Sequence, residues 1–243
     1  MIRLIAGREL RALWALPSTW FLLALLQFVF AWFFLARTEY FLEIQPQLAQ
    51  LANPPGVTVT VAVPLFNILA MLLMMLTPLF TMRLIAEERR NQTFPLLLSA
   101  PLSSAQIVLG KSLGLWVFLL LVVIAAPLMV ATLAVGTQLD NGLILSNVLG
   151  LGLLLSSDIA LGLYCSTLSA QPVVAAASAL VLLVGLWLAD ILASDEASPW
   201  HALSPLHHFQ SFNNGLLDSQ DAAFFVLFSA VFLILSWRRI RAE

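Results

Sequence analysis

The chain has 243 residues, of which 61% are hydrophobic and only 10% are charged, and its formal net charge is -2. A soluble domain carries about 25% charged residues. No water-soluble fold of this length can bury so much apolar surface, so lipid must be the solvent. The single cysteine, Cys165, excludes an internal disulfide framework, and its apolar neighbours are typical of a buried, unreactive thiol. The charge balance gives no sign of a nucleic-acid partner, and we expect none.

The first 18 residues form a basic amphipathic pattern. Apolar residues such as Ile5 and Leu13 recur between charged ones, which is typical of a helix lying in the plane of the lipid headgroups. The alternative is a solvated flank of the first membrane span. The charged residues of this segment are Arg3, Arg8, Glu9 and Arg11.

Six apolar stretches follow, each close to the ~17–25 residues that a membrane-spanning helix needs. They predict an all-α membrane protein with six transmembrane helices in a single domain. Pro64 and Pro78 lie within the second stretch and should bend it. The predicted spans are residues 19–36, 60–82, 112–133, 143–168, 173–192 and 221–237.

The distribution of charge predicts how these spans are oriented. Six spans put both termini on one side, and every Lys and Arg except Arg37 then falls on that side. Cytoplasmic loops carry the excess of basic residues. We therefore expect both termini and the loop at residues 83–111 in the cytoplasm of a bacterial cell, with the chain in its inner membrane. Residues 193–220 would form an extracytoplasmic segment.

The loop at residues 83–111 is the longest charged interruption of the apolar sequence. The second helix should continue through Arg90, and Asn91 or Thr93 could cap a new short helix, with Pro95 in its first turn. An apolar ridge at residues 96–98 would need a membrane surface or a partner to cover it. The S-x-x-Q pattern at residues 103–106 is a capping box that begins the third span. The alternative is an ordinary interfacial loop helix without a docking role.

The same loop carries the run AEERRNQT at residues 86–93, then a triple leucine, Pro101 and IVLGK at residues 107–111. It resembles the membrane subunit of ABC-2 type ABC transporters and is similar, more narrowly, to the gliding-motility-associated permeases. In that family two acids and two bases precede a Gly-Thr pair, a leucine run, a proline and a restart ending in Gly-Lys. Here Gln92 stands where the family usually has Gly, and Pro95 where it usually has Glu. Residues 7–17 and 203–221 also resemble the family, so the likeness covers nearly the whole chain.

The resemblance implies a permease that works as a dimer, with a second copy or a paralogue, on separate cytoplasmic ATPase subunits. ATP and Mg would be bound by the ATPase, and an extracytoplasmic auxiliary protein and membrane lipid are further expected partners. The alternatives are a membrane anchor that converts ATPase cycles into force or signalling, and a permease serving copper-enzyme maturation. We assign the coupling to the ATPase to Glu87, Glu88, Arg89, Arg90, Thr93, Leu96, Leu97, Leu98 and Pro101.

The chain itself should not hydrolyse ATP. Its nearest approach to a phosphate-binding motif is AQIVLGKS at residues 105–112, which lacks the first glycine of that motif. It also follows a helix cap rather than a buried strand. We therefore predict no catalytic residue, cofactor site or metal site on this chain.

Two features lie inside the fourth span. Asp158 sits mid-span, where a carboxylate costs ~2.5–3.5 kcal/mol on insertion scales and marks a functional candidate. A structural hydrogen bond to the hydroxyl of Ser156, Ser157 or Tyr164 is the alternative. Small residues recur at every fourth position as Gly152, Ser156 and Ala160, a pattern that lets helices pack closely in lipid.

Polar residues near the outer ends of the last two spans are the remaining candidates. We expect Asp190 to reach the membrane interface. His201, His207 and His208 fall in the outer segment. Adjacent histidines do not easily bind one ion together, and we expect acidic neighbours to be sparse, so the pattern does not favour a metal site.

Overall fold

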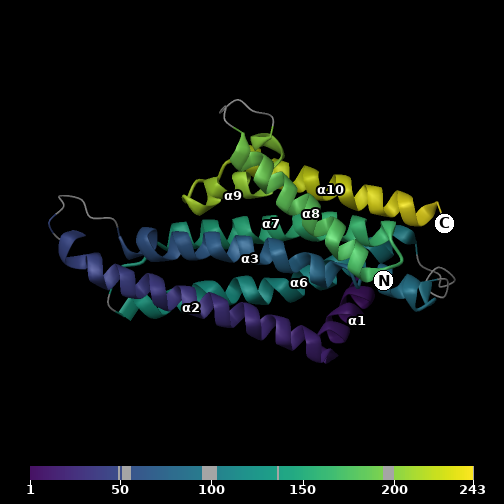
Figure 1. Ribbon diagram of the computed structural model, residues 1–243, viewed down its shortest axis with the longest axis horizontal. Coiled ribbons are helices and arrows are strands. Elements are labelled where there is room, and N and C mark those ends of the chain that lie inside the picture. Colours follow the sequence, from purple (N-terminus) through teal and green to yellow (C-terminus); the bar gives the residue numbers. More distant parts are fainter. Residues whose placement is uncertain (49, 51–55, 95–102, 136, 194–199, 243) are drawn as a thin grey trace.

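The computed structural model describes residues 1–48, 50, 56–94, 103–135, 137–193 and 200–242. All regular structure in these ranges is helical, and the longest helices run along one common axis (Figure 1). The helices are α1 (Ile2–Ala15), α2 (Pro17–Leu48), the π-helix η1 (Thr58–Ala62), α3 (Val63–Thr81), α4 (Ala86–Arg90), α6 (Ser104–Ala131), the 3₁₀ helix η2 (Thr132–Val135), α7 (Asn141–Leu168), α8 (Pro172–Leu192), the 3₁₀ helix η3 (His201–Leu203), α9 (Pro205–Asn213) and α10 (Ser219–Arg241).

Six helical segments are long and apolar enough to cross a membrane, which confirms the predicted number of spans. They are α2, the segment Thr58–Arg90, the segment Ser104–Ala134, α7, α8 and α10. Both chain termini lie at the same end of this bundle (Figure 1). We call it the termini end and the other the opposite end.

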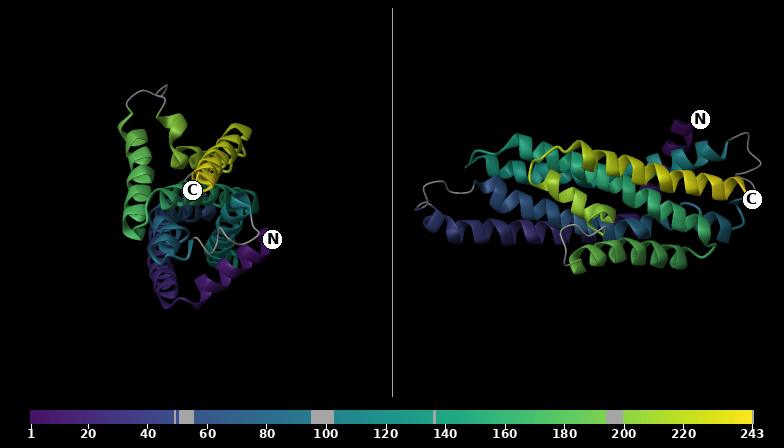
Figure 2. Two further views of the ribbon diagram at one scale, coloured as in Figure 1. Left: turned by 90° about the vertical axis from the view of Figure 1, so that its right-hand side faces the viewer. Right: turned by 90° about the horizontal axis from the view of Figure 1, so that it is seen from above.

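Helix α7 is the centre of the bundle. In its most apolar window 72% of the residues are buried, against 22% for both α8 and α10. Seen from the termini end, α8 and α10 lie on one side of the bundle, and α1 and α2 lie on the other (Figure 2). A side chain at Gly150 would collide with Phe212 of α9, and one at Gly162 would collide with Thr81 of α3. These glycines let the neighbouring elements approach α7 closely.

Helix α1 crosses the termini end and packs on the start of α6. A methyl group at Gly110 would lie 2.6 Å from the side chain of Ile5, and one at Gly114 would lie 2.9 Å from the carbonyl oxygen of Ala6. The two glycines lie four positions apart on α6 and so form a flat surface for α1. The helix predicted within residues 1–18 is thus present, and its position in the headgroup plane stays a prediction.

Two helix boundaries differ from the prediction. Helix α2 continues to Leu48, well beyond the predicted end at Ala36. Residues 37–48 contain no Gly, and their single Pro, Pro46, lies near the end of the helix. No helix-breaking residue therefore stands at Ala36, where the sequence becomes more polar. The second span, in contrast, does not run on unbroken through Arg90. It ends at Thr81, and α4 begins at Ala86.

Candidate functional site

The interruption between α3 and α4 is held by a hydroxyl group from α7. The side chain of Ser166 accepts hydrogen bonds from the backbone N–H of Ile85 at 3.2 Å and of Ala86 at 3.0 Å. It also donates to the carbonyl oxygen of Met82 at 3.2 Å. A helix break in an apolar bundle exposes backbone groups that need partners. Ser166 supplies them, so α4 has a fixed start.

Helix α4 ends in a Schellman motif. The N–H of Thr93 donates to the carbonyl of Glu88 at 2.9 Å, and the N–H of Gln92 donates to that of Arg89 at 3.1 Å. The hydroxyl of Thr93 donates to the same Glu88 carbonyl at 3.2 Å. Gln92 has φ 56°, a left-handed conformation that favours Gly. Asn91 is the residue that caps the end of α4. Helical structure resumes at Phe94, directly after Thr93, and the short helix predicted beyond it lies outside the described residues.

A buried ion-pair cluster joins α4 to α1 and α6. The Lys111 ammonium donates to Glu9 Oε1 at 2.7 Å and to Glu88 Oε1 at 2.8 Å. The Lys111 side chain is 2% exposed, and those of Glu9 and Glu88 are 13% and 17% exposed. Arg8 approaches Glu88 from the solvent side at 3.5 Å. The coupling cluster, as we call Arg8, Glu9, Glu88 and Lys111, therefore holds two positive and two negative charges.

Further contacts support α4 from both sides. Arg83 donates to the hydroxyl of Ser18, which lies in the first turn of α2, at 3.1 Å. The guanidinium of Arg89 lies over the ring of Phe94, 5.1 Å from its centroid. Of the predicted coupling residues, Glu87, Glu88, Arg89, Arg90 and Thr93 belong to α4 or its end. The others, Leu96, Leu97, Leu98 and Pro101, lie outside the described residues.

Sequence reasoning missed the importance of Glu9 and Lys111. Both residues stand in the motifs that carry the family resemblance, GRELR at residues 7–11 and IVLGK at residues 107–111. Their pairing joins positions 102 apart in sequence, which no local pattern reveals. The predicted capping box is present, since the N–H of Gln106 donates to the Ser103 hydroxyl and the N–H of Ser103 donates to the Gln106 side chain.

The sequence AQIVLGKS is continuous α-helix within α6. A phosphate-binding loop presents a row of free backbone N–H groups, whereas those of a helix interior are already bonded. The Lys111 of this motif is engaged with two carboxylates. This segment therefore contacts α1 and α4 through Lys111.

Asp158 lies inside the bundle. It is fully buried, and neither carboxylate oxygen has a hydrogen-bond partner among the described residues. The structural hydrogen bond to the hydroxyl of Ser156, Ser157 or Tyr164, the alternative role for Asp158, is therefore not formed. Contacts between the segment Thr58–Arg90 and α7 join residues that are 81 or 82 positions apart in sequence, from Thr58 with Asp140 to Ile85 with Ser166. Asp158 thus lies at the level of Thr77, whose hydroxyl is occupied by the Leu73 carbonyl at 2.7 Å.

The family model for ABC-2 family transporter proteins matches residues 3–239. The chain belongs to the ABC-2 transporter family. A search of curated proteins found no significant match. Family membership and six apolar spans make the chain a multi-pass membrane component of an ABC transporter, and such membrane subunits work with an ATPase subunit.

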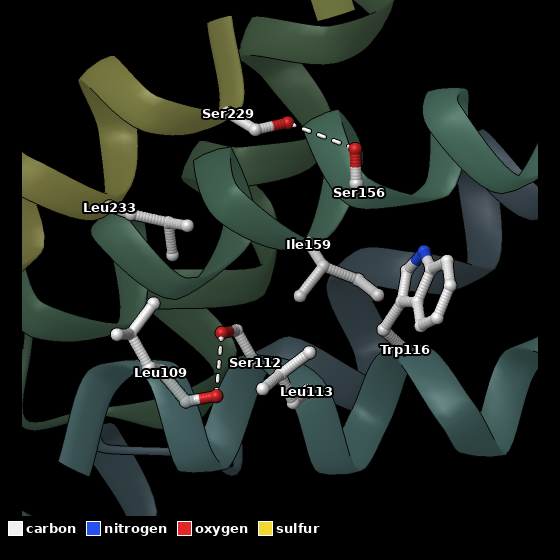
Figure 3. Close-up of a pocket in the computed structure, with 8 residues that line it drawn as sticks. All are labelled: Leu109, Ser112, Leu113, Trp116, Ser156, Ile159, Ser229 and Leu233. Carbon is white, nitrogen blue, oxygen red and sulfur yellow. Dashed lines mark hydrogen bonds between the residues drawn. The ribbon is translucent and has the colours of Figure 1, made fainter. Parts of the chain in front are cut away.

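This ABC-2 protein has an apolar pocket of about 230 Å³ between α6, α7 and α10 (Figure 3). Its few polar groups include the hydroxyls of Ser156 and Ser229, which lie 3.0 Å apart, and the hydroxyl of Ser112, which donates to the Leu109 carbonyl. Such a lining suits an apolar ligand. The eight lining residues are Leu109, Ser112, Leu113, Trp116, Ser156, Ile159, Ser229 and Leu233.

The predicted small-residue strip of α7 borders this pocket. Ser156 lines it, and the carbonyl of Gly152 accepts a hydrogen bond from the indole N–H of Trp116 at 2.9 Å. A methyl group at Gly152 would meet nothing closer than 3.7 Å, which is ordinary van der Waals contact. Ala160 is fully buried. The close-packing role of this strip stays a prediction.

The histidines of this ABC-2 protein are paired with acids, contrary to the expectation that acidic neighbours are sparse. Asp190 lies in the last turn of α8, and its place at the membrane interface stays a prediction. Its Oδ1 lies 2.5 Å from Nδ1 of His201 and 3.3 Å from Nδ1 of His207. His208 instead pairs with Asp221 at 2.6 Å.

Proposed function

We propose that this chain is the permease subunit of an ABC-2 exporter, driven by a separate ATPase subunit that binds ATP and Mg²⁺. The burial of Lys111 between Glu9 and Glu88 is the observation that carries the proposal. It joins the charged segment α4 to a membrane-spanning helix, α6, and to the surface helix α1. The proposal also takes a second permease copy or a paralogue as the partner within the membrane.

Through the coupling cluster, a movement of α4 would also move α1 and α6. Breaking a buried ion pair by removing one partner costs ~3–5 kcal/mol because an uncompensated charge remains in the interior. A displacement of α4 by a docked ATPase is therefore shared with α1 and α6, because separating them is costly. Rigid-body shifts of packed helices of this kind are a common form of conformational switching.

The apolar residues that follow α4 are the proposed anchors for the ATPase. Leu96, Leu97 and Leu98 begin three positions after the end of the Schellman motif in sequence, and the charged residues Glu87 and Arg90 of α4 precede them. Docking of a helix into a groove uses apolar anchors with polar edges. Under this proposal the termini end faces the cytoplasm of a bacterium, and the opposite end meets any auxiliary protein outside.

A narrower assignment to the gliding-motility-associated permeases remains a prediction. The matched family model describes ABC-2 transporters in general, and the likeness to that subgroup rests on the loop sequence, with residues 7–17 and 203–221 as support. The membrane-anchor reading and the copper-enzyme reading share the same coupling and differ in what crosses the membrane. Transport therefore has to be measured directly.

Co-purification with the ATPase encoded beside this chain tests the docking step. Leu97→Asp should abolish recovery of the ATPase but leave the permease in the membrane, because a charge cannot fill an apolar groove. The matched control is Leu217→Asp at the opposite end, where the side chain is 65% exposed, and it should leave recovery unchanged. Normal recovery with Leu97→Asp would refute the docking assignment.

Transport by the purified complex in sealed vesicles tests export itself. Candidate lipids, peptides and polysaccharides would be labelled and followed in the presence of ATP. ATP-dependent movement of any of them supports the exporter. A complex that hydrolyses ATP in response to the permease but moves none of them supports the membrane anchor.

A further inference from the structure

Three side chains from three separate elements converge where α8, η3 and α9 meet. Asp190 lies in the last turn of α8, His201 in η3 and His207 in the first turn of α9. Their ligand atoms all lie within 4.8 Å of one another. The Asp190 carboxylate is 14% exposed, whereas the His207 side chain is 49% exposed. The cluster is therefore held by the fold on one side and open on the other.

We propose that Asp190, His201 and His207 bind a divalent transition-metal ion, and that Zn²⁺ suits them well. Imidazole nitrogen and carboxylate oxygen are common zinc ligands at ~2.0–2.2 Å, which puts neighbouring ligand atoms in a tetrahedron ~3.3 Å apart. The distance from His207 Nδ1 to Asp190 Oδ1 is 3.3 Å. The contact from His201 to Asp190, at 2.5 Å, is a hydrogen bond that would open as the ion entered.

The neighbouring pair of His208 and Asp221 shows what a structural His–Asp contact looks like in this protein. Both ring nitrogens of His208 are used, Nδ1 by Asp221 at 2.6 Å and Nε2 by the carbonyl of Ala202 at 3.2 Å. Its ring stacks on Phe224 at 3.9 Å between centroids. In the proposed site, by contrast, two imidazoles direct Nδ1 at one carboxylate oxygen. These are the atoms that a divalent cation would take as its ligands.

Binding would tie the two ends of the segment between α8 and α9 together. Asp190 ends one helix, His207 begins the next, and α9 packs on α7 through Phe212 and Gly150. The ion would therefore fix α9 against the centre of the bundle. Three protein ligands leave a fourth position for water or for a ligand from outside.

Zinc titration of the full chain tests this site. The protein would be purified in detergent with a tag that contains no histidine, stripped with a chelator, and titrated with ZnCl₂ against a chromogenic chelator. We expect saturation at one zinc ion per chain. Loss of a ligand should weaken binding at least ~tenfold, since even changes to groups behind the ligands cost 10–100-fold. Asp190→Asn and His207→Gln are the two variants.

His208→Gln is the matched control, because it removes the adjacent imidazole, which pairs with Asp221 instead. It should bind zinc as the unchanged protein does. Zinc should also raise the melting temperature of the unchanged protein and of His208→Gln, but not of the two ligand variants, because an ion that binds the folded state stabilises it. This second readout separates lost binding from misfolding. An absence of saturable binding, or equal weakening by His208→Gln and His207→Gln, would overturn the proposal.

Discussion

At Lys111 one ammonium lies between two carboxylates, Glu9 and Glu88, that would otherwise face each other at the surface of α6. The pairing explains why a lysine can be almost completely buried at the end of an apolar helix. It also links Glu88, one of the predicted coupling residues, with Glu9, which belongs to a different predicted segment of the chain. Single residues of this kind decide how the termini end holds together, and Lys111 and Gln92 give direct tests there.

Replacing Lys111 with Met keeps the stem of the side chain and removes its charge. We expect the free energy of unfolding to fall by about 3–5 kcal/mol, because Glu9 and Glu88 are left partly buried and unpaired. The protein level in the membrane and the melting temperature in detergent would measure this. Arg8→Ala is the control, and since Arg8 is 67% exposed the loss there should stay below about 1 kcal/mol.

Gln92 pays a conformational cost at the end of α4. Its φ of 56° lies where an L-residue with a side chain is disfavoured by roughly 1–2 kcal/mol. Gln92→Gly should therefore raise the melting temperature, whereas Gln92→Ala should leave it nearly unchanged because alanine meets the same restriction. Equal effects of the two substitutions would show that the backbone conformation is not the cause.

Asp158 is the residue to change inside the bundle. Asp158→Asn keeps the shape and removes the charge, so the protein level should hold or rise, because a buried amide costs less than an unpaired carboxylate. If this functional candidate serves transport, ATP hydrolysis stimulated by the permease should fall. Asp218→Asn, which preserves a helix cap at the opposite end, is the control. Full activity in Asp158→Asn would remove it from the candidate residues.

At the scale of the elements, the contact between α1 and α6 depends on Gly110 and Gly114. This contact brings Glu9 to Lys111, so the glycines position the coupling cluster as well as the helix. Aromatic contacts hold the C-terminal end of α1, where Trp14 packs edge-on against Trp20 and Phe118. The surface helix is thus attached to the bundle by charge at its middle and by rings at its end.

Gly114→Ala should push α1 away from α6, because the new methyl group would lie 2.9 Å from the Ala6 carbonyl oxygen, which is backbone and cannot rotate aside. We expect a loss of about 1–3 kcal/mol in stability, typical of overpacking. The same substitution at Gly185, where nothing lies within 4 Å, should be neutral or stabilising. Thermal unfolding of both variants in detergent compares them, and equal destabilisation would refute the close approach.

Elements were predicted well where local chemistry decides them. Apolar length placed all six spans, and the Ser103–Gln106 capping box placed the start of α6. The end of α2 was placed too early, because polarity marks the edge of the lipid but does not stop a helix. The break after Thr81 was missed, since it depends on the hydroxyl of Ser166 from a helix 80 residues away.

At the scale of the whole molecule, the pairs that define the candidate sites join distant parts of the chain. Lys111 meets Glu9, and His201 meets Asp190 across an intervening segment. Sequence patterns identified most of these residues as polar exceptions but could not show which of them meet. The six spans predict how often the chain crosses the membrane. The distribution of Lys and Arg predicts which end of the bundle faces the cytoplasm.

Cysteine labelling tests that direction. In a background with Cys165→Ser, a cysteine at Leu216, which is 64% exposed at the opposite end, should react with an impermeant maleimide added to intact spheroplasts. A cysteine at Asn91, after α4, should react only once the membrane is opened. Labelling of the Asn91 position in sealed spheroplasts would reverse the orientation, and with it the side on which an ATPase could dock.

The hydroxyl of Ser166 has a consequence for biosynthesis. The ribosome completes the second span about 80 residues before Ser166 is made, so the backbone N–H groups of Ile85 and Ala86 first meet the membrane without their later acceptor. An unbroken helix is then the arrangement that satisfies them. The angle of α4 can be set only when the fourth span inserts beside the second. The nascent chain therefore cannot complete α4, the start of the proposed docking segment, until more than two thirds of it has been translated.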